Sequence, residues 1–228
     1  MANLLLIETS SKNCSVGISV HGRLLAIEEL SEASFSHAEK LHPFIESTLK
    51  QAGLMSKDLA GVVVGKGPGS YTGLRIGVAA AKGLCFALNI PLITIGSLET
   101  LAMTAIETLT ASYDYIIPMI DARRMEVYTA IFDTKGRQLK APWAEVLEGD
   151  SYTEYLTNGQ CLFIGDGQQK WEALASHPNA TFETTIQEPS IRYMMAIGTQ
   201  KFEAADVEDL AYFEPFYLKE FYTTPPKK

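Results

Sequence analysis

The chain has 228 residues, 46% of them hydrophobic, and a formal net charge of −8, so it can bury a core as one domain or as two small lobes. The acidic balance argues against a protein that binds nucleic acid unaided, because phosphate backbones attract basic surfaces. Three scattered cysteines without Cys-x-x-Cys spacing, no basic leader and no apolar run of membrane-spanning length favour a soluble cytoplasmic protein with no membrane contact.

The first half of the chain predicts a three-stranded meander followed by alternating helices and strands. The expected strands are 4–8, 15–20, 24–30, 62–65 and 92–95, and the expected helices are about 36–53, 73–88 and 97–110. Ser36 begins a possible capping box for the first of these helices. Pro43 is expected to kink that helix or to delay its start to about His42, because an interior proline costs about 3 kcal/mol.

The second half repeats this plan loosely. Its expected strands are 115–121, 126–132, 138–146 and 162–165, and its expected helices lie near 153, near 171 and at 191–204. The first strand of each half ends in a carboxylate, Glu8 or Asp121, and the repeat predicts two lobes of one topology, residues 1–112 and 113–228. The two carboxylates could hold a magnesium ion or water across a cleft, or each could cap its own turn.

Residues 61–77, GVVVGKGPGSYTGLRIG, carry the strongest local pattern. Glycines at 65, 67 and 69 separate a strand from a helix that opens through Ser70. Glycine permits close approach, and a helix N-terminus presents N–H groups to anions, so this segment is either a phosphate-binding loop or a tight strand-to-helix turn. It lacks the Lys-Ser or Lys-Thr pair of a P-loop, the third glycine of a dinucleotide site and the spacing of a nucleophile elbow.

The helix predicted at 73–88 is apolar on two sides. One stripe holds Leu74, Val78, Ala81, Cys85 and Leu88, and a second holds Ile76, Ala80, Gly83 and Ala87. An outer helix needs one apolar stripe, so the second predicts contact with another subunit or burial inside the chain itself. If the second stripe removes about 300 Å² of apolar area from water, the gain is about 7 kcal/mol before association costs.

Two further groups of side chains favour structural roles. The four histidines have no spacing that suits a shared metal ion. Aromatic residues crowd around Pro215, which predicts core packing or a seam between lobes in preference to a base-stacking platform.

These motifs together resemble the TsaB family, formerly called YeaZ, which is related to TsaD within the glycoprotease-like group. The resemblance spans nearly the whole chain and rests on Ile7-Glu8-Thr9-Ser10, on the glycine segment, on Asp121-Ala122-Arg123 and on Tyr217-Leu218-Lys219. It implies an α/β, actin-like ASKHA fold with two ribonuclease-H-like lobes (βββαβα repeated, the second lobe reduced). It also implies a role in making threonylcarbamoyladenosine in tRNA.

The resemblance further implies that this chain is not the catalytic subunit. TsaD holds a metal through an H-x-x-x-H pair, and Ser97 and Leu101 stand at the matching positions here. Neither side chain can replace imidazole as a ligand, so we expect no TsaD-like metal centre and no catalytic residues. A family of this kind implies a scaffold that pairs with a TsaD-like subunit, is joined by a TsaE-like ATPase and meets tRNA only within the complex.

The expected sites follow from the same resemblance. The surface for the TsaD-like subunit, and for a possible homodimer, is predicted at Leu41, Phe44, Ile76, Ala80, Gly83 and Ala87. Weak ATP or ADP binding is predicted at Glu8, Thr9, Gly67, Gly69 and Ser70. Two alternatives remain open at this point: a glycoprotease-like metallopeptidase, and a small-molecule kinase of the ASKHA type.

Overall fold

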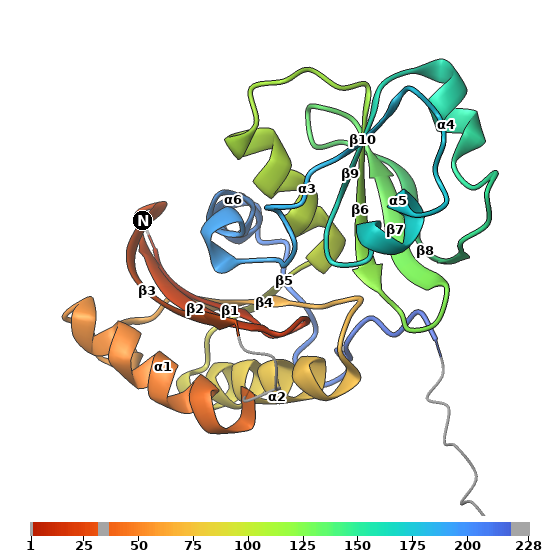
Figure 1. Cartoon of the computed structure of the whole chain (residues 1–228). Coiled ribbons are helices and arrows are strands. Elements are labelled where there is room, and N and C mark those ends of the chain that lie inside the picture. The colour runs from red at the N-terminus through yellow and green to blue at the C-terminus, as the bar shows by residue number, and fades with distance from the viewer. Residues whose placement is uncertain (1, 32–36, 220–228) are drawn as a thin grey trace, which may run out of the picture.

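The computed structural model describes residues 2–31 and 37–219, which form two five-stranded sheets (Figure 1). The first sheet has the order β3-β2-β1-β4-β5 and the second the order β10-β9-β6-β7-β8. In each, three antiparallel strands form a meander, and the two later strands run parallel to its first strand. The strands are β1 (Asn3–Glu8), β2 (Asn13–Val20), β3 (Arg23–Ser31), β4 (Gly61–Gly65), β5 (Leu92–Ile95), β6 (Tyr115–Asp121), β7 (Glu126–Phe132), β8 (Gln138–Val146), β9 (Cys161–Ile164) and β10 (Ala180–Phe182).

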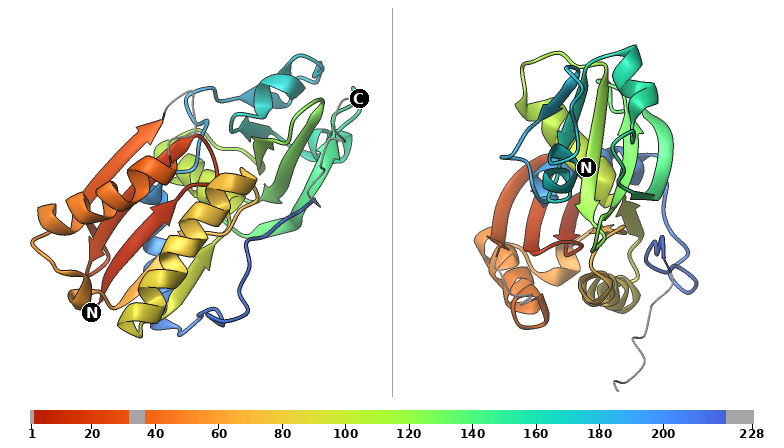
Figure 2. Two further views of the ribbon diagram at one scale, coloured as in Figure 1. Left: turned by 90° about the horizontal axis from the view of Figure 1, so that it is seen from below. Right: turned by 45° about the vertical axis from the view of Figure 1, so that its right-hand side comes forward.

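The helices confirm the duplicated plan and its reduction in the second half. Helices α1 and α2 cover the outer face of the first sheet, and α3 and α6 lie between the two sheets (Figures 1 and 2). The counterparts of α1 and α2 in the second half are α4 and α5, which are much shorter. The predicted actin-like fold with two ribonuclease-H-like lobes is therefore confirmed. The helices are α1 (His37–Gln51), α2 (Tyr71–Leu88), α3 (Ser97–Thr108), α4 (Thr153–Asn158), α5 (Gln168–Glu172) and α6 (Met195–Glu203), with 3₁₀ turns η1 (Ser56–Asp58) and η2 (Ile191–Tyr193).

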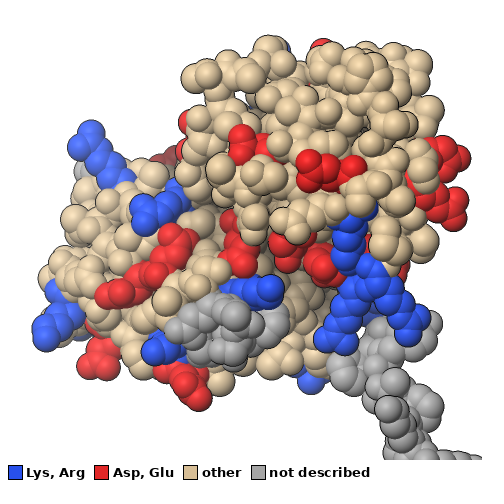
Figure 3. All heavy atoms as spheres, viewed as in Figure 1, with Lys and Arg blue, Asp and Glu red and all other residues tan. Residues whose placement is uncertain are grey.

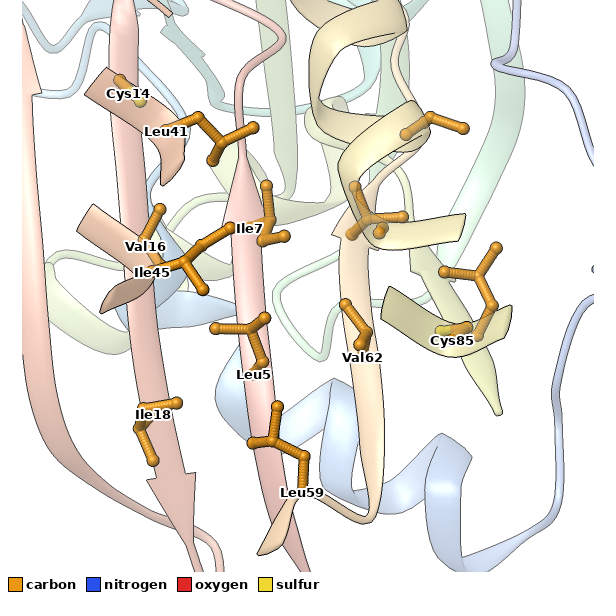
Figure 4. Packing of buried hydrophobic residues seen from close by; sticks show 14 of the residues in the cluster. Leu5, Ile7, Cys14, Val16, Ile18, Leu41, Ile45, Leu59, Val62 and Cys85 are labelled. Carbon is orange, nitrogen blue, oxygen red and sulfur yellow. The ribbon is translucent and has the colours of Figure 1, made fainter. Parts of the chain in front are cut away.

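The hydrophobic core beneath α1 and α2 sets the position of both helices. Leu5 and Ile7 of β1 pack there with Leu41 and Ile45 of α1 and Cys85 of α2, all of them buried (Figure 4). Burial of a large aliphatic side chain contributes roughly 1.5–3 kcal/mol. These contacts fix the pair of helices that carry the whole predicted docking surface.

Each half of the sequence contributes a helix that packs against the sheet of the other half. Ile191 and Met194, around η2, pack on the inner face of the first sheet, together with partly buried residues of α6. Leu98 and Leu101 of α3 join the core of the second sheet. The proposed boundary between residues 1–112 and 113–228 stays a prediction, since helices on both sides of it contact the sheet of the other half.

Several sequence predictions differ from the structure. Helix α1 begins by His37 and continues through Pro43 to Gln51, so the expected start near His42 is wrong. Burial of Leu41 and Ile45 offsets the lost hydrogen bond at the proline. The helix expected at 191–204 is divided into η2 and α6, and the short strand β10 was not predicted. Ser36, the possible cap, lies outside the described residues.

Within residues 2–31 and 37–219, no helix combines the length and the apolar character that a membrane span requires.

Candidate functional site

The glycine loop packs tightly against the end of β1. A Cβ atom at Gly69 would overlap the carbonyl oxygen of Ser10, and one at Gly73 would overlap that of Thr9. Because two backbone segments meet there, a larger residue has no side chain to push aside. The loop and the first turn of α2 are therefore shaped by the chain that leaves β1.

Hydrogen bonds hold this packing together. The Ser70 N–H donates to the Ser10 carbonyl at 2.6 Å, and the Thr9 hydroxyl donates to the Gly73 carbonyl at 2.9 Å. Ser70 Oγ also accepts from the Gly73 N–H at 3.3 Å, so Ser70 is the N-cap of α2. The chain thus satisfies part of the helix N-terminus that a phosphate could otherwise use.

Glu8 is a fully buried carboxylate at the centre of this region. Its Oε1 accepts the Ser10 N–H at 2.7 Å, and its Oε2 lies 3.4 Å from the Ser97 hydroxyl. Burial raises the pKa of Glu8, although hydrogen bonds from Ser10, Thr9 and Ser97 act in the opposite direction. Burial leaves the Glu8 side chain no direct contact with solvent.

The five residues predicted to contact nucleotide lie where the end of β1 meets the glycine loop, and they contact other residues of this region. Glu8 and Thr9 are fully buried, Gly67 is buried beside Leu74, and Gly69 and Ser70 are partly exposed. This packing gives the glycine loop a structural role. Nucleotide binding at this loop stays a prediction.

The residues considered for metal binding have other partners. Ser97 is buried next to Glu8, and Leu101 is fully buried in the core of the second sheet. Asp121 is exposed and pairs with Lys170 at 2.6 Å, so it does not share a hydrogen-bond partner with Glu8. Across the described part of the chain, no group of three or more histidine, cysteine, aspartate and glutamate side chains is arranged to hold a metal ion.

An apolar groove of about 560 Å³ lies between α1 and α2. Ile76, Ala80 and Gly83, all predicted for the docking surface, line it from the α2 side. Nothing lies within 4 Å of a Cβ placed at Gly83, so the floor of the groove is open at that point. The remaining lining residues are Ala38, His42, Ile45, Ala79 and Leu84.

The other predicted docking residues lie around this groove. Phe44 is partly buried and packs against the core beneath α1, and Ala87 is exposed on the last turn of α2. Leu41, by contrast, is fully buried, so it supports α1 from below and does not line the surface. Sequence reasoning did not include Ala38 and His42 in the docking surface, although the spacing of four residues between them and of three from His42 to Ile45 places all three on one face of α1.

A C-terminal segment covers the opposite flank of α2. The Lys82 ammonium donates to the Phe213 carbonyl at 2.8 Å, and the rings of Tyr71 and Tyr217 lie 5.1 Å apart. The predicted aromatic packing near Pro215 is thus confirmed for Phe213, which packs against the core, whereas Tyr217 contacts Tyr71 but is exposed, and Tyr212 is 85% exposed. With this flank covered, the open apolar side of α2 is the one that faces α1.

Comparisons with known proteins agree with the motifs and the fold. A family model described as "TsaD: tRNA N6-adenosine threonylcarbamoyltransferase" matches residues 31–218. The tRNA threonylcarbamoyladenosine biosynthesis protein TsaB of Bacillus subtilis is 32% identical, with 95% of this chain and 93% of that protein covered. The protein of the same name from Escherichia coli is 28% identical, with 95% and 94% covered.

Solved structures agree as well. YeaZ from Pseudomonas aeruginosa matches with a TM-score of 0.82 and 26% sequence identity, covering 96% of this chain and 100% of that one. The family model spans most of the chain, and the Bacillus subtilis relative aligns over nearly all of both sequences. The chain therefore belongs to the TsaB family, a branch of the larger family that the TsaD model describes.

Proposed function

We propose that this chain is a non-catalytic subunit of the assembly that makes threonylcarbamoyladenosine in tRNA, and that it acts by binding a TsaD-like catalytic subunit. The names of its relatives supply the pathway. The observation that carries the binding role is the apolar groove between α1 and α2, which is lined by small residues of α2. Small side chains let a partner helix approach closely, so burial there contributes a large apolar area.

The proposed partner face consists of Ile76, Ala80, Gly83 and Ala87 of α2, flanked by Phe44 of α1. The same face would pair two copies of this chain when the TsaD-like subunit is absent. A TsaE-like ATPase joins the pair, and tRNA meets the chain only in that assembly. The chain acts in the cytoplasm, where the tRNA substrate is found.

Gly83→Arg tests the docking face. We expect this variant to lose co-purification with the TsaD-like subunit, because a long charged side chain would fill the open groove, while its thermal unfolding stays that of a folded monomer. Gly149→Arg is the matched control, since nothing lies within 4 Å of a Cβ at Gly149 either and this glycine is in the second lobe. Equal binding by wild type and Gly83→Arg would overturn the assignment.

Reconstitution tests the function itself. The TsaD-like subunit, the TsaE-like ATPase, threonylcarbamoyl adenylate and tRNA are combined with and without this protein, and modified adenosine is measured. We expect modification to depend on this protein. A purified sample that alone cleaves a sialoglycoprotein, and loses that activity with a chelator, would instead establish the metallopeptidase alternative.

A further inference from the structure

The turn between β6 and β7 carries two adjacent arginines in the left-handed region of backbone conformation. The φ angles are 71° at Arg123 and 50° at Arg124, and both residues are exposed. Tight hairpins with two positive φ values favour Asn-Gly, because a Cβ atom disfavours this conformation. The backbone geometry of the turn therefore does not explain why both positions are arginine. The explanation must come from what the two side chains do.

The backbone of this turn is held in place from both sides. Asp121 Oδ1 accepts the Arg123 N–H at 2.6 Å, and the Glu126 N–H donates to the Arg123 carbonyl at 3.2 Å. The Ala122 N–H donates to the Glu126 carbonyl at 3.1 Å. These bonds hold the backbone from which both side chains extend, so no backbone ordering has to be added to the entropic cost of binding a ligand.

The carboxylates at the two ends of the turn pair with lysines, not with these arginines. Asp121 pairs with Lys170, and Glu126 pairs with Lys219 from the C-terminal segment. Neither guanidinium forms a hydrogen bond or an ion pair with any described residue. Figure 3 shows Lys and Arg atoms gathered at the corner where the β6–β7 turn meets the C-terminal segment, on a chain whose net charge is −8.

We propose that Arg123 and Arg124 bind the phosphate backbone of the tRNA when this chain is part of the modification complex. The inference rests on the proposed function and adds to it a contact for the nucleic acid. Guanidinium groups match phosphate oxygens with paired hydrogen bonds. A contact to phosphates positions RNA without reading its sequence, and the turn lies on the second lobe, outside the α1–α2 pair that would hold the catalytic subunit (Figure 1).

The test measures tRNA affinity of the assembled complex at several salt concentrations, using an unmodified tRNA transcript. A plot of log K against log salt has a negative slope. The double variant Arg123→Gln/Arg124→Gln should make this slope less steep by about 1.4–1.8, since each lost phosphate contact removes about 0.7–0.9. With equal binding of wild type and variant at about 1 M salt as the reference, this change of slope makes the variant bind roughly 25–60 times more weakly at about 0.1 M salt. The matched control is Lys135→Gln/Arg137→Gln, which removes two charges from the β7–β8 turn of the same lobe.

The outcomes separate this inference from the proposed function. It is supported if the Arg123/Arg124 variant alone loses affinity and salt slope while it still co-purifies with the TsaD-like subunit. It is overturned if both double variants behave alike, if tRNA binding is unchanged, or if co-purification is lost, since that last result assigns the turn to a protein contact. Failure of wild-type protein to support any tRNA modification would instead reject the proposed function.

Discussion

At the scale of single residues, the glycine loop shows how a sequence motif can have a structural cause far away in the chain. Its glycines and the first turns of α2 lie against Glu8, Thr9 and Ser10, which precede them by about sixty residues. Sequence reasoning left a phosphate loop and a tight turn open, because it had no means of knowing what the loop packs against. Close contacts with Glu8 and Ser10 account for Gly65 and Gly69, and a φ of 97° accounts for Gly67, without any ligand.

Two alanine substitutions on α2 test this account. Gly73→Ala should lower the free energy of unfolding by about 1–3 kcal/mol, because its Cβ would overlap the Thr9 carbonyl and neither backbone can yield easily. Gly83→Ala, in open space on the same helix, should raise it by about 0.5–1 kcal/mol through better helix propensity. Urea unfolding gives both values. If the two variants shift stability in the same direction, close packing is not the reason for Gly73.

Glu8 predicts a dependence of stability on pH. Burial raises its pKa in the folded state, so the folded protein holds this proton more tightly than the unfolded chain does. Stability from this residue is therefore complete below the unfolded pKa and is lost as the pH rises through the folded pKa. Glu8→Gln cannot ionise, and the stability of wild type relative to this variant should fall with rising pH in urea unfolding experiments.

Glu29 provides a control of opposite sign. Burial raises the pKa of Glu29, but hydrogen bonds from Ser190, Asn13, Ser15 and Arg192 together outweigh it, and the pKa is lowered. Its contribution to stability is present above the unfolded pKa and is lost as the pH falls through the folded pKa. Wild type should thus gain stability relative to Glu29→Gln as the pH rises. A Glu8→Gln series with the slope of the Glu29→Gln series would contradict the burial argument.

At the scale of elements, the sequence predicted long, strongly patterned segments well. Strands β5, β6, β7 and β8 begin and end at the predicted residues, and α2 ends at the predicted Leu88, where the left-handed conformation of Asn89 closes the helix. Short or interrupted elements were less predictable. Strand β10 has three partly buried residues with no clear alternation, and the last helical region is divided at Met194, which follows η2 and precedes α6.

The candidate site was predictable only where one helix carries it. The second apolar stripe of α2 was visible from its spacing, and three of its four residues line the groove. The residues that α1 contributes to the groove could not be predicted from spacing. Leu41 and Ala38 are both apolar, and only the angle of α1 on the sheet decides which of them is buried. Arg123 and Arg124 were also missed as a site, because left-handed conformation is a property of the folded turn.

At the scale of the whole molecule, several segments of the chain join the two lobes. Helices α3 and α6 lie between the sheets, and the C-terminal segment runs past α2 to the ion pair between Lys219 and Glu126 of β7. Helices α1 and α2 cover the outer face of the first sheet, and partners that need the groove between them must compete.

This competition is a prediction about assembly. If the second stripe of α2 in each copy buries about 300 Å² of apolar area, a homodimer buries roughly 600 Å² through this stripe, about half of the roughly 1,200 Å² of total surface that a stable specific interface buries. Self-association limited to this stripe should therefore be weak, and a TsaD-like subunit that contacts more of the chain than the stripe should replace it with a heterodimer. Sedimentation equilibrium over a range of concentrations, with and without that subunit, measures both states. Gly83→Arg should lose both together and Gly149→Arg should keep both, whereas a homodimer that survives in Gly83→Arg would show that the two assemblies use different faces.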